Sequence, residues 1–250
     1  MIVCKSTVEL DKMRAAGRVV AKVLDEVARR VAPGMTTLEL EALAEDAIAR
    51  EGAEPAFKGY HGYPCVLCTS VNEEIVHGIP SERQVMRGDI VSIDVGVKLD
   101  GFYADSATTV ALEPVSSEVE RLLQVTREAL ELGIEQAKTG NYLADISGAI
   151  QQHVEAAGFS VVREFVGHGI GTALHEEPQV PNYVTPGKGR GPKLAPGMVL
   201  AIEPMVTTGS PAVRMQSNCW TAQTTDGGYA AHFEHSVAVT ENGPWVLTLP

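Results

Sequence analysis

Hydrophobic residues recur at helical spacing in two pairs of segments, one pair in each half of the chain. Residues 8–31 and 37–51 place apolar side chains every three or four positions, and residues 116–138 and 143–157 do the same. The stretch "PGMTT" ends the first of these segments and supplies a cap for the second. The pattern therefore predicts four amphipathic helices arranged as two helix pairs.

Strand-like segments follow the first helix pair. Residues 66–71, 90–97 and 102–112 are rich in apolar and β-branched side chains, and glycines and prolines separate them. Similar short segments follow the second helix pair. The chain thus repeats one plan, helix pair and then strands, in its two halves.

Glycine spacing and one acidic position support an internal duplication. Two glycines 18 residues apart bracket the second helix of each pair: Gly34 and Gly52, then Gly140 and Gly158. The segment "MRGDIVSIDVG" (86–96) is similar to "LAPGMVLAIEP" (194–204), aligned so that Asp94 corresponds to Glu203. Helix and strand patterns are common, but the two matches together favour duplication over coincidence.

We expect an α+β fold with pseudo-twofold halves and a curved antiparallel β-sheet covered by α-helices. The boundary between the halves lies near "EPVSS", which is too short for a linker. We therefore expect one catalytic domain over 1–250, with halves of about 1–113 and 114–250. The segment "TPGKGRGPK" (185–193) has no Ser or Thr after its Gly-Lys pair, so a mobile surface loop is expected there and not a phosphate loop.

Bulk composition narrows the possible partners and the compartment. The 250 residues are 44% hydrophobic and 21% charged, and the net charge of −12 argues against nucleic acid or an anionic membrane as a partner. No apolar run resembles a signal peptide or reaches the roughly 20 residues of a membrane span. Four cysteines are too few for a disulfide scaffold, so we expect a cytoplasmic protein.

Cys65 and Cys68 form a C-x-x-C motif without a second pair. A structural zinc site would need further thiolates, and a redox pair would normally open a helix. Here the motif follows Pro64 and enters a strand-like segment. Buried or pocket-lining thiols are the expected outcome.

Acidic residues interrupt segments that otherwise have the pattern of buried strands. Asp94 interrupts "IVSIDVGV" and is expected at the end of its strand. Asp105 follows eleven residues later at the start of the next strand, where a hairpin would bring both carboxylates to one end of a sheet. Glu203 in "GMVLAIEPMV" and Glu234 in "AAHFEHSVAV" repeat the anomaly. Buried charges need compensation, and basic residues are scarce in these segments, so a bound metal is the expected solution.

His168 in "VGHGIG" adds an imidazole among small residues, which would allow a metal to approach closely. Four carboxylates and one imidazole suit two divalent ions, and the oxygen-rich set favours Mn, Fe or Co over structural zinc. Two such ions acidify a water molecule and polarise a carbonyl, a chemistry known from phosphatases, nucleases and aminopeptidases. His77 and His175 are candidate hydrogen-bond donors, although spacing alone does not separate this role from an ordinary structural one.

Several motifs together resemble one enzyme family. "FVGHGIGTALHEEPQVPNY" (165–183), "GYHGYP" (59–64), "VNEEIVHGIP" (71–80) and "IEP" (202–204) match signature segments of type I methionine aminopeptidases, the short bacterial form with the pita-bread fold. The resemblance runs from the first helix to "TENGPWVLT" near the C-terminus. It implies removal of the initiator methionine from nascent chains, with preference for a small second residue.

The resemblance also implies residue roles. Two metal ions would be bound by the set Asp94, Asp105, His168, Glu203 and Glu234. Asp105 and Glu234 would bridge the ions, and Glu203 would also accept a proton from the attacking water. His77 and His175 would contact the substrate, with His175 at the developing oxyanion or the peptide backbone. The methionine pocket would be lined by Tyr60, Tyr63, Cys68 and Trp220.

Three positions depart from the family pattern: Phe57, Leu174 and His232, the last where glutamine is common. We expect them to affect side-chain preference while leaving the metal ligands intact. The implied partners are nascent polypeptide N-termini near the ribosome, with no nucleic acid or membrane, and the chain is expected to be a monomer. Two alternatives remain open: an Xaa-Pro peptidase of the same fold, and a metal-free pseudoenzyme that binds peptides.

Overall fold

Four long helices form at the positions that the periodicity predicts. The computed structural model describes all residues, 1–250. The helices are α1 (Thr7–Arg30), α2 (Thr37–Arg50), α3 (Ser117–Gln136) and α4 (Leu143–Ala156). Ser6 and Thr36 cap the first two, each with a glutamate three residues later whose carboxylate accepts from the cap backbone N–H. The predicted helix boundaries are confirmed to within two residues.

The strands are numerous and mostly short, and every pairing between them is antiparallel. In the first half they are β1 (Glu54–Pro55), β2 (Leu67–Val71), β3 (Glu74–Val76), β4 (Ile90–Leu99) and β5 (Phe102–Ala111), with a 3₁₀ turn at Tyr60–Gly62. In the second half they are β6 (Ser160–Val161), β7 (Gly167–Gly169), β8 (Glu176–Val180), β9 (Val199–Ile202), β10 (Met205–Thr207), β11 (Val213–Met215), β12 (Ala222–Thr224), β13 (Ala230–His232), β14 (His235–Thr240) and β15 (Gly243–Val246). They form four hydrogen-bonded groups: β4 with β1, β2 and β5; β13-β10-β6; β11-β12-β3; and β15-β14-β9-β7-β8.

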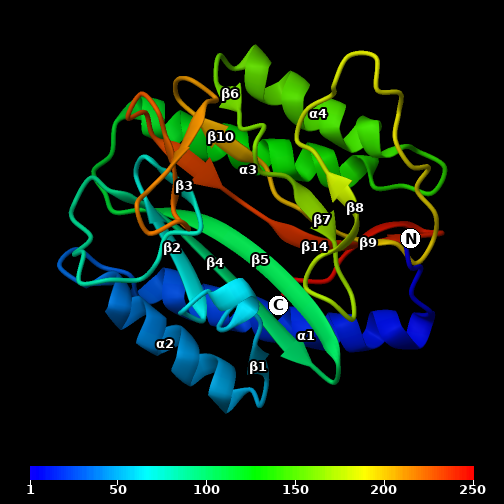
Figure 1. The fold of residues 1–250 in the computed structure, drawn as a ribbon, viewed down its shortest axis with the longest axis horizontal. Coiled ribbons are helices and arrows are strands. Elements are labelled where there is room, and N and C mark those ends of the chain that lie inside the picture. The colour runs from blue at the N-terminus through cyan, green and yellow to red at the C-terminus, as the bar shows by residue number, and fades with distance from the viewer.

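Each half builds its own hydrophobic core between its helix pair and its strands. Figure 1 shows α1 and α2 along one side of the strands and α3 and α4 along the other. Side chains such as Val20, Leu40 and Ile93 form the first core, and Leu122, Ile146 and Leu200 belong to the second. The curved layer of strands therefore lies between two layers of helix, as expected for the pita-bread fold.

Equivalent backbone contacts in the two halves support duplication. Gly34, with φ of 94°, donates to the carbonyl of Val85, and Gly140, with φ of 93°, donates to the carbonyl of Leu194. Two residues after each glycine an isolated β-bridge forms: Thr36 with Gln84 in the first half and Tyr142 with Lys193 in the second. Both glycines adopt a left-handed conformation that other residues adopt only at a cost. This explains why glycine occupies the equivalent position before the second helix of each pair.

The halves meet along β5 and β14, and serine hydroxyls hold this seam. Asp105 N–H donates to Ser236 Oγ at 3.1 Å, and the same hydroxyl donates to the carbonyl of Asp105 at 2.8 Å. Ser106 Oγ donates to the carbonyl of Glu234 at 2.6 Å. The backbone of Asp105 is thus fixed to β14, and the backbone of Glu234 is fixed to β5.

The glycine-rich segment 185–193 lies at the surface, as expected. Residues 186–191 are all exposed. The segment is nevertheless tied to the start of α4, because Leu143 and Ala144 donate backbone N–H groups to Pro192 and Arg190, and Arg190 pairs with Asp145. None of the helices combines the length and hydrophobicity needed to cross a bilayer.

Two glycines in helix interiors should respond oppositely to alanine. Alanine normally stabilises a helix by up to about 1 kcal/mol relative to glycine. A Cβ on Gly17 in α1 would lie 2.1 Å from the carbonyl oxygen of Leu247, whereas on Gly148 in α4 it would meet only a methyl group of Val184 at 3.6 Å. We expect Gly17→Ala to lower the free energy of unfolding by about 1–3 kcal/mol through overpacking, and Gly148→Ala to leave it unchanged or raise it. Urea denaturation of both variants checks this, and equal effects of the two changes would contradict it.

Candidate metal centre and its pocket

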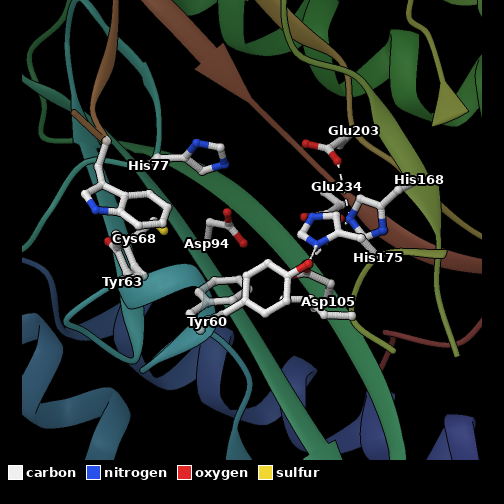
Figure 2. Close-up of a pocket in the computed structure, with 13 residues that line it drawn as sticks. Tyr60, Tyr63, Cys68, His77, Asp94, Asp105, His168, His175, Glu203 and Glu234 are labelled. Atoms are coloured by element: carbon white, nitrogen blue, oxygen red, sulfur yellow. Dashed lines mark hydrogen bonds and ion pairs between the residues drawn. The ribbon is translucent and has the colours of Figure 1, made fainter. Parts of the chain in front are cut away.

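One cavity collects the residues that the sequence singled out. It holds about 630 Å³ of space, part of it open to solvent. Figure 2 shows Tyr63 and Cys68 at one end, His168, His175, Glu203 and Glu234 at the other, and Asp94 between them. The lining residues are Phe57, Tyr60, Tyr63, Cys68, His77, Asp94, Asp105, His168, Leu174, His175, Glu203, Trp220 and Glu234. The structure thus brings together every candidate ligand, both candidate donor histidines and the whole expected methionine pocket.

The first two acids come from the β4–β5 hairpin. Asp94 pairs with Ala107 and Asp105 pairs with Gly96, so the two aspartates are diagonal neighbours on the same face. The prediction that a hairpin brings them together is confirmed. The prediction that Asp94 ends its strand is wrong, because β4 continues for five residues beyond it, to Leu99.

Glu203 and Glu234 occupy breaks between strands and do not lie within strands, which corrects the expectation. Glu203 follows β9 and precedes β10, and Glu234 lies between β13 and β14. The breaks face each other, because Ile202 pairs with His235 before them and Met205 pairs with His232 after them. At these breaks the chain passes from one sheet to another, and each crossing directs a carboxylate into the cavity.

His168 lies on β7 with its Nδ1 atom 2.9 Å from the carbonyl oxygen of Gly169. A carbonyl only accepts, so Nδ1 carries the proton and the lone pair of the neutral ring is on Nε2. That nitrogen lies 3.7 Å from Oε1 of Glu203 and 4.0 Å from Oδ2 of Asp105. A lone pair facing two carboxylates is repulsive unless a cation lies between them, so this geometry fits a metal ligand.

The glycines beside His168 lie against the backbone of two neighbouring strands. A Cβ on Gly167 would lie 2.3 Å from the carbonyl oxygen of Ala201 on β9, and a Cβ on Gly169 would lie 2.3 Å from that of Glu177 on β8. The glycines therefore let neighbouring strands pack closely around the histidine.

The four carboxylates have no compensating Lys or Arg. All the ion pairs they make within 4.0 Å are with His168 or His232. Burial raises the pKa of Asp94 to about 6, and burial followed by the neighbouring carboxylates raises the pKa of Asp105 and of Glu234 well above the ordinary range. One oxygen of each of these three groups is buried without a hydrogen-bond partner.

These unpaired oxygens show that the residues present fit divalent cations. One ligand atom from each of Asp105, His168 and Glu234 lies within 4.8 Å of the other two. Asp94 and Glu203 line the same cavity beside them. Oxygen ligands with one imidazole suit hard or borderline ions, as inferred from the sequence.

His232, the third departure from the family pattern, is a further functional candidate. It lies outside the cavity lining and contacts one of the candidate ligands. It is buried behind Glu203, with Nε2 3.3 Å from Glu203 Oε2. Burial alone would raise the pKa of Glu203, but His232 and the other nearby imidazoles outweigh it and lower that pKa. The signal available in the sequence was a histidine two residues before an acid in an apolar segment.

The two candidate donor histidines flank the carboxylates. His77 has a left-handed backbone, with φ of 60°, at the end of β3, a conformation that is rare for non-glycine residues and concentrated at functional sites. His175 lies 4.1 Å from His168 between ring centroids. Burial lowers the pKa of His77, and burial followed by His168 lowers the pKa of His175 to about 4. His175 is therefore neutral near pH 7.

The far wall of the cavity is aromatic. Tyr63 and Trp220 meet edge to face, with centroids 5.1 Å apart, and the hydroxyl of Tyr63 lies 3.0 Å from the carbonyl oxygens of Leu67 and Gly78. Cys68 is buried beside them, as predicted for a pocket-lining thiol, and burial raises its pKa. Phe57, one of the departures from the family pattern, also lines this cavity.

Comparisons with known proteins agree with this site. The model of "Metallopeptidase family M24" matches residues 11–241. The methionine aminopeptidase of Clostridium acetobutylicum is 51% identical over 250 residues, covering 100% of this chain and 99% of that protein. The crystal structure of methionine aminopeptidase from Thermotoga maritima superposes with a TM-score of 0.97 at 47% identity, covering all of both chains.

A more distant likeness shows the fold alone. Prolidase from Pyrococcus furiosus superposes with a TM-score of 0.78 at 22% identity, and the match covers 99% of this chain but only 66% of the prolidase. The whole-length matches at about 50% identity are instead to methionine aminopeptidases. The chain belongs to metallopeptidase family M24, among its methionine aminopeptidases.

Proposed function

We propose that this metallopeptidase removes the N-terminal methionine of nascent proteins with two divalent ions held by its five clustered ligands. The ligands are Asp94, Asp105, His168, Glu203 and Glu234. The observation that carries this proposal is the convergence of four carboxylates and the Nε2 atom of His168, without Lys or Arg, beside an aromatic pocket. Asp105 and Glu234 lie on the seam between the halves, where each would contribute a carboxylate to the ions.

When bound, the ions would activate a water molecule and polarise the scissile carbonyl. Glu203 is suited to accept a proton, because His232 holds it ionised while burial raises the pKa values of the other three acids. His77 and His175 are neutral and can donate hydrogen bonds to the peptide from either side of the carboxylates. Holding the peptide between fixed groups supplies much of the catalysis in such sites.

The aromatic wall would hold the methionine side chain. Tyr63, Cys68 and Trp220 present rings and a sulfur atom, surfaces on which a flexible thioether packs well. Phe57 and Leu174 narrow the same cavity. We also propose a preference for a small second residue, which the resemblance to type I methionine aminopeptidases implies.

We propose Co, Mn or Fe as the ions, a cytoplasmic location, and nascent polypeptide N-termini near the ribosome as partners of a monomeric chain. We propose no nucleic-acid or membrane partner, because the net charge of −12 would repel the phosphates of either.

Removing one carboxylate ligand should remove both metal binding and activity. We expect Asp105→Asn, which keeps the shape but loses the charge, to lower kcat/KM for Met-Ala-Ser at least about 100-fold, since even residues behind the ligands typically contribute 10–100-fold. Wild type should bind two ions per chain by calorimetry and gain thermal stability on loading.

Asp100→Asn provides a matched control on the same hairpin. Asp100 lies exposed in the turn between β4 and β5 with φ of 49°, a conformation that asparagine accepts. This variant should keep both metal binding and activity. Metal-loaded Asp105→Asn with normal activity would contradict the proposed centre, and a wild type inactive with every divalent ion would favour the pseudoenzyme.

Substrate choice separates the two enzyme hypotheses. Met-Ala-Ser should be cleaved at least 100-fold faster than Ala-Pro-Ser, because the aromatic pocket gains little from a methyl group and nothing in the cavity is specific for proline. A liquid-chromatography assay of both peptides at equal concentration measures the ratio. Preference for the proline peptide would establish the Xaa-Pro alternative.

A further inference from the structure

Tyr60 makes a contact that its expected place in the methionine pocket does not explain. Its hydroxyl lies 2.8 Å from Nδ1 of His175, and the two rings are 5.2 Å apart at an angle of 31°. Figure 2 shows the phenol hydroxyl of Tyr60 directed at the imidazole of His175 and away from Tyr63. No other hydrogen bond of the Tyr60 hydroxyl occurs in the structure.

We propose that Tyr60 is a positioning residue that fixes the tautomer of His175: its O–H donates to Nδ1, so the ring proton stays on Nε2. The proposal rests on the role of His175 as a donor to the substrate given above. A neutral imidazole has one donor and one acceptor nitrogen, and the partner of one nitrogen decides the character of the other. With Nδ1 occupied as an acceptor, Nε2 is the nitrogen that can donate.

The opposite arrangement is less favourable in this cavity. If Nδ1 held the proton and donated to the phenol oxygen, the phenol proton would have no acceptor in the chain. Nε2 would then be a bare lone pair in a cavity lined by four carboxylates, including Glu203. Before the ions bind, the negative potential of these groups favours a proton on Nε2. Burial also raises the pKa of Tyr60, so its hydroxyl keeps the proton it donates.

Neighbouring His168 is fixed in the other tautomer by the same principle. Its Nδ1 faces a backbone carbonyl, which can only accept, so its Nε2 carries the lone pair. The two imidazoles are 4.1 Å apart, yet one is prepared to bind a cation and the other to donate a hydrogen bond. The difference lies in the Nδ1 partner of each ring.

Tyr60→Phe tests this proposal, because it keeps the ring and removes only the hydroxyl. The tautomer is read by ¹⁵N NMR of histidine-labelled full-length chain at neutral pH, without metal and with diamagnetic Zn²⁺, and His175 is assigned by its absence in His175→Gln. Wild type should show a protonated Nε2 and an unprotonated Nδ1. In Tyr60→Phe the two tautomers should be mixed, and kcat for Met-Ala-Ser should fall about threefold to tenfold, the effect of a neutral hydrogen bond, with KM nearly unchanged.

Tyr103→Phe is the matched control, since the Tyr103 hydroxyl makes no hydrogen bond and the ring lies outside the cavity lining. It should change neither the NMR signals nor kcat. A protonated Nδ1 in wild type, an unchanged tautomer in Tyr60→Phe, or a rise in KM alone would overturn the proposal. An intact wild-type tautomer in a chain without peptidase activity would instead refute the proposed function and leave the Tyr60 contact standing.

Discussion

Repulsion among four carboxylates in one cavity, three of them buried, is the constraint on which the site depends. Asp94, Asp105, Glu203 and Glu234 line one cavity with no Lys or Arg within ion-pair distance. Burying one unpaired charge already costs several kcal/mol. Without cations the cluster is relieved by protonation, which is why burial and mutual proximity raise three of the four pKa values. Divalent ions offset the same cost and leave the oxygens available as ligands.

Local patterns in the sequence predict the helices and identify the four acids as candidate metal ligands. Helix ends follow from periodicity and capping residues, and the acids are conspicuous because they interrupt apolar segments. The strand breaks at Glu203 and Glu234 depend on which strands pair, which is not local information. Pro204 offered a hint of the first break, since proline is uncommon inside sheets, but nothing comparable marks the second.

Contacts between distant segments could not be predicted from spacing. Tyr60 and His175 are 115 residues apart, and His232 meets Glu203 only because β10 and β13 pair. In each case the sequence shows the histidine but does not show which side chain lies against it. For histidine the partner decides the chemistry, because the group bonded to one ring nitrogen determines whether the other donates a proton or a lone pair.

Duplication supplies two acids from each half, but the halves present them differently. The first half uses a continuous hairpin whose diagonal positions share a face, as Asp94 and Asp105 do. In the second half, two paired strands are interrupted at facing positions, so that β10 and β13 leave the sheet of β9 and β14.

The redirected strands β10 and β13 lie against the loop after β2, where Ala230 donates its backbone N–H to the carbonyl of Asn72. That loop leads into β3, which pairs with β12. His77 follows β3 and Trp220 precedes β12, so the same breaks that aim the glutamates also support the wall opposite them.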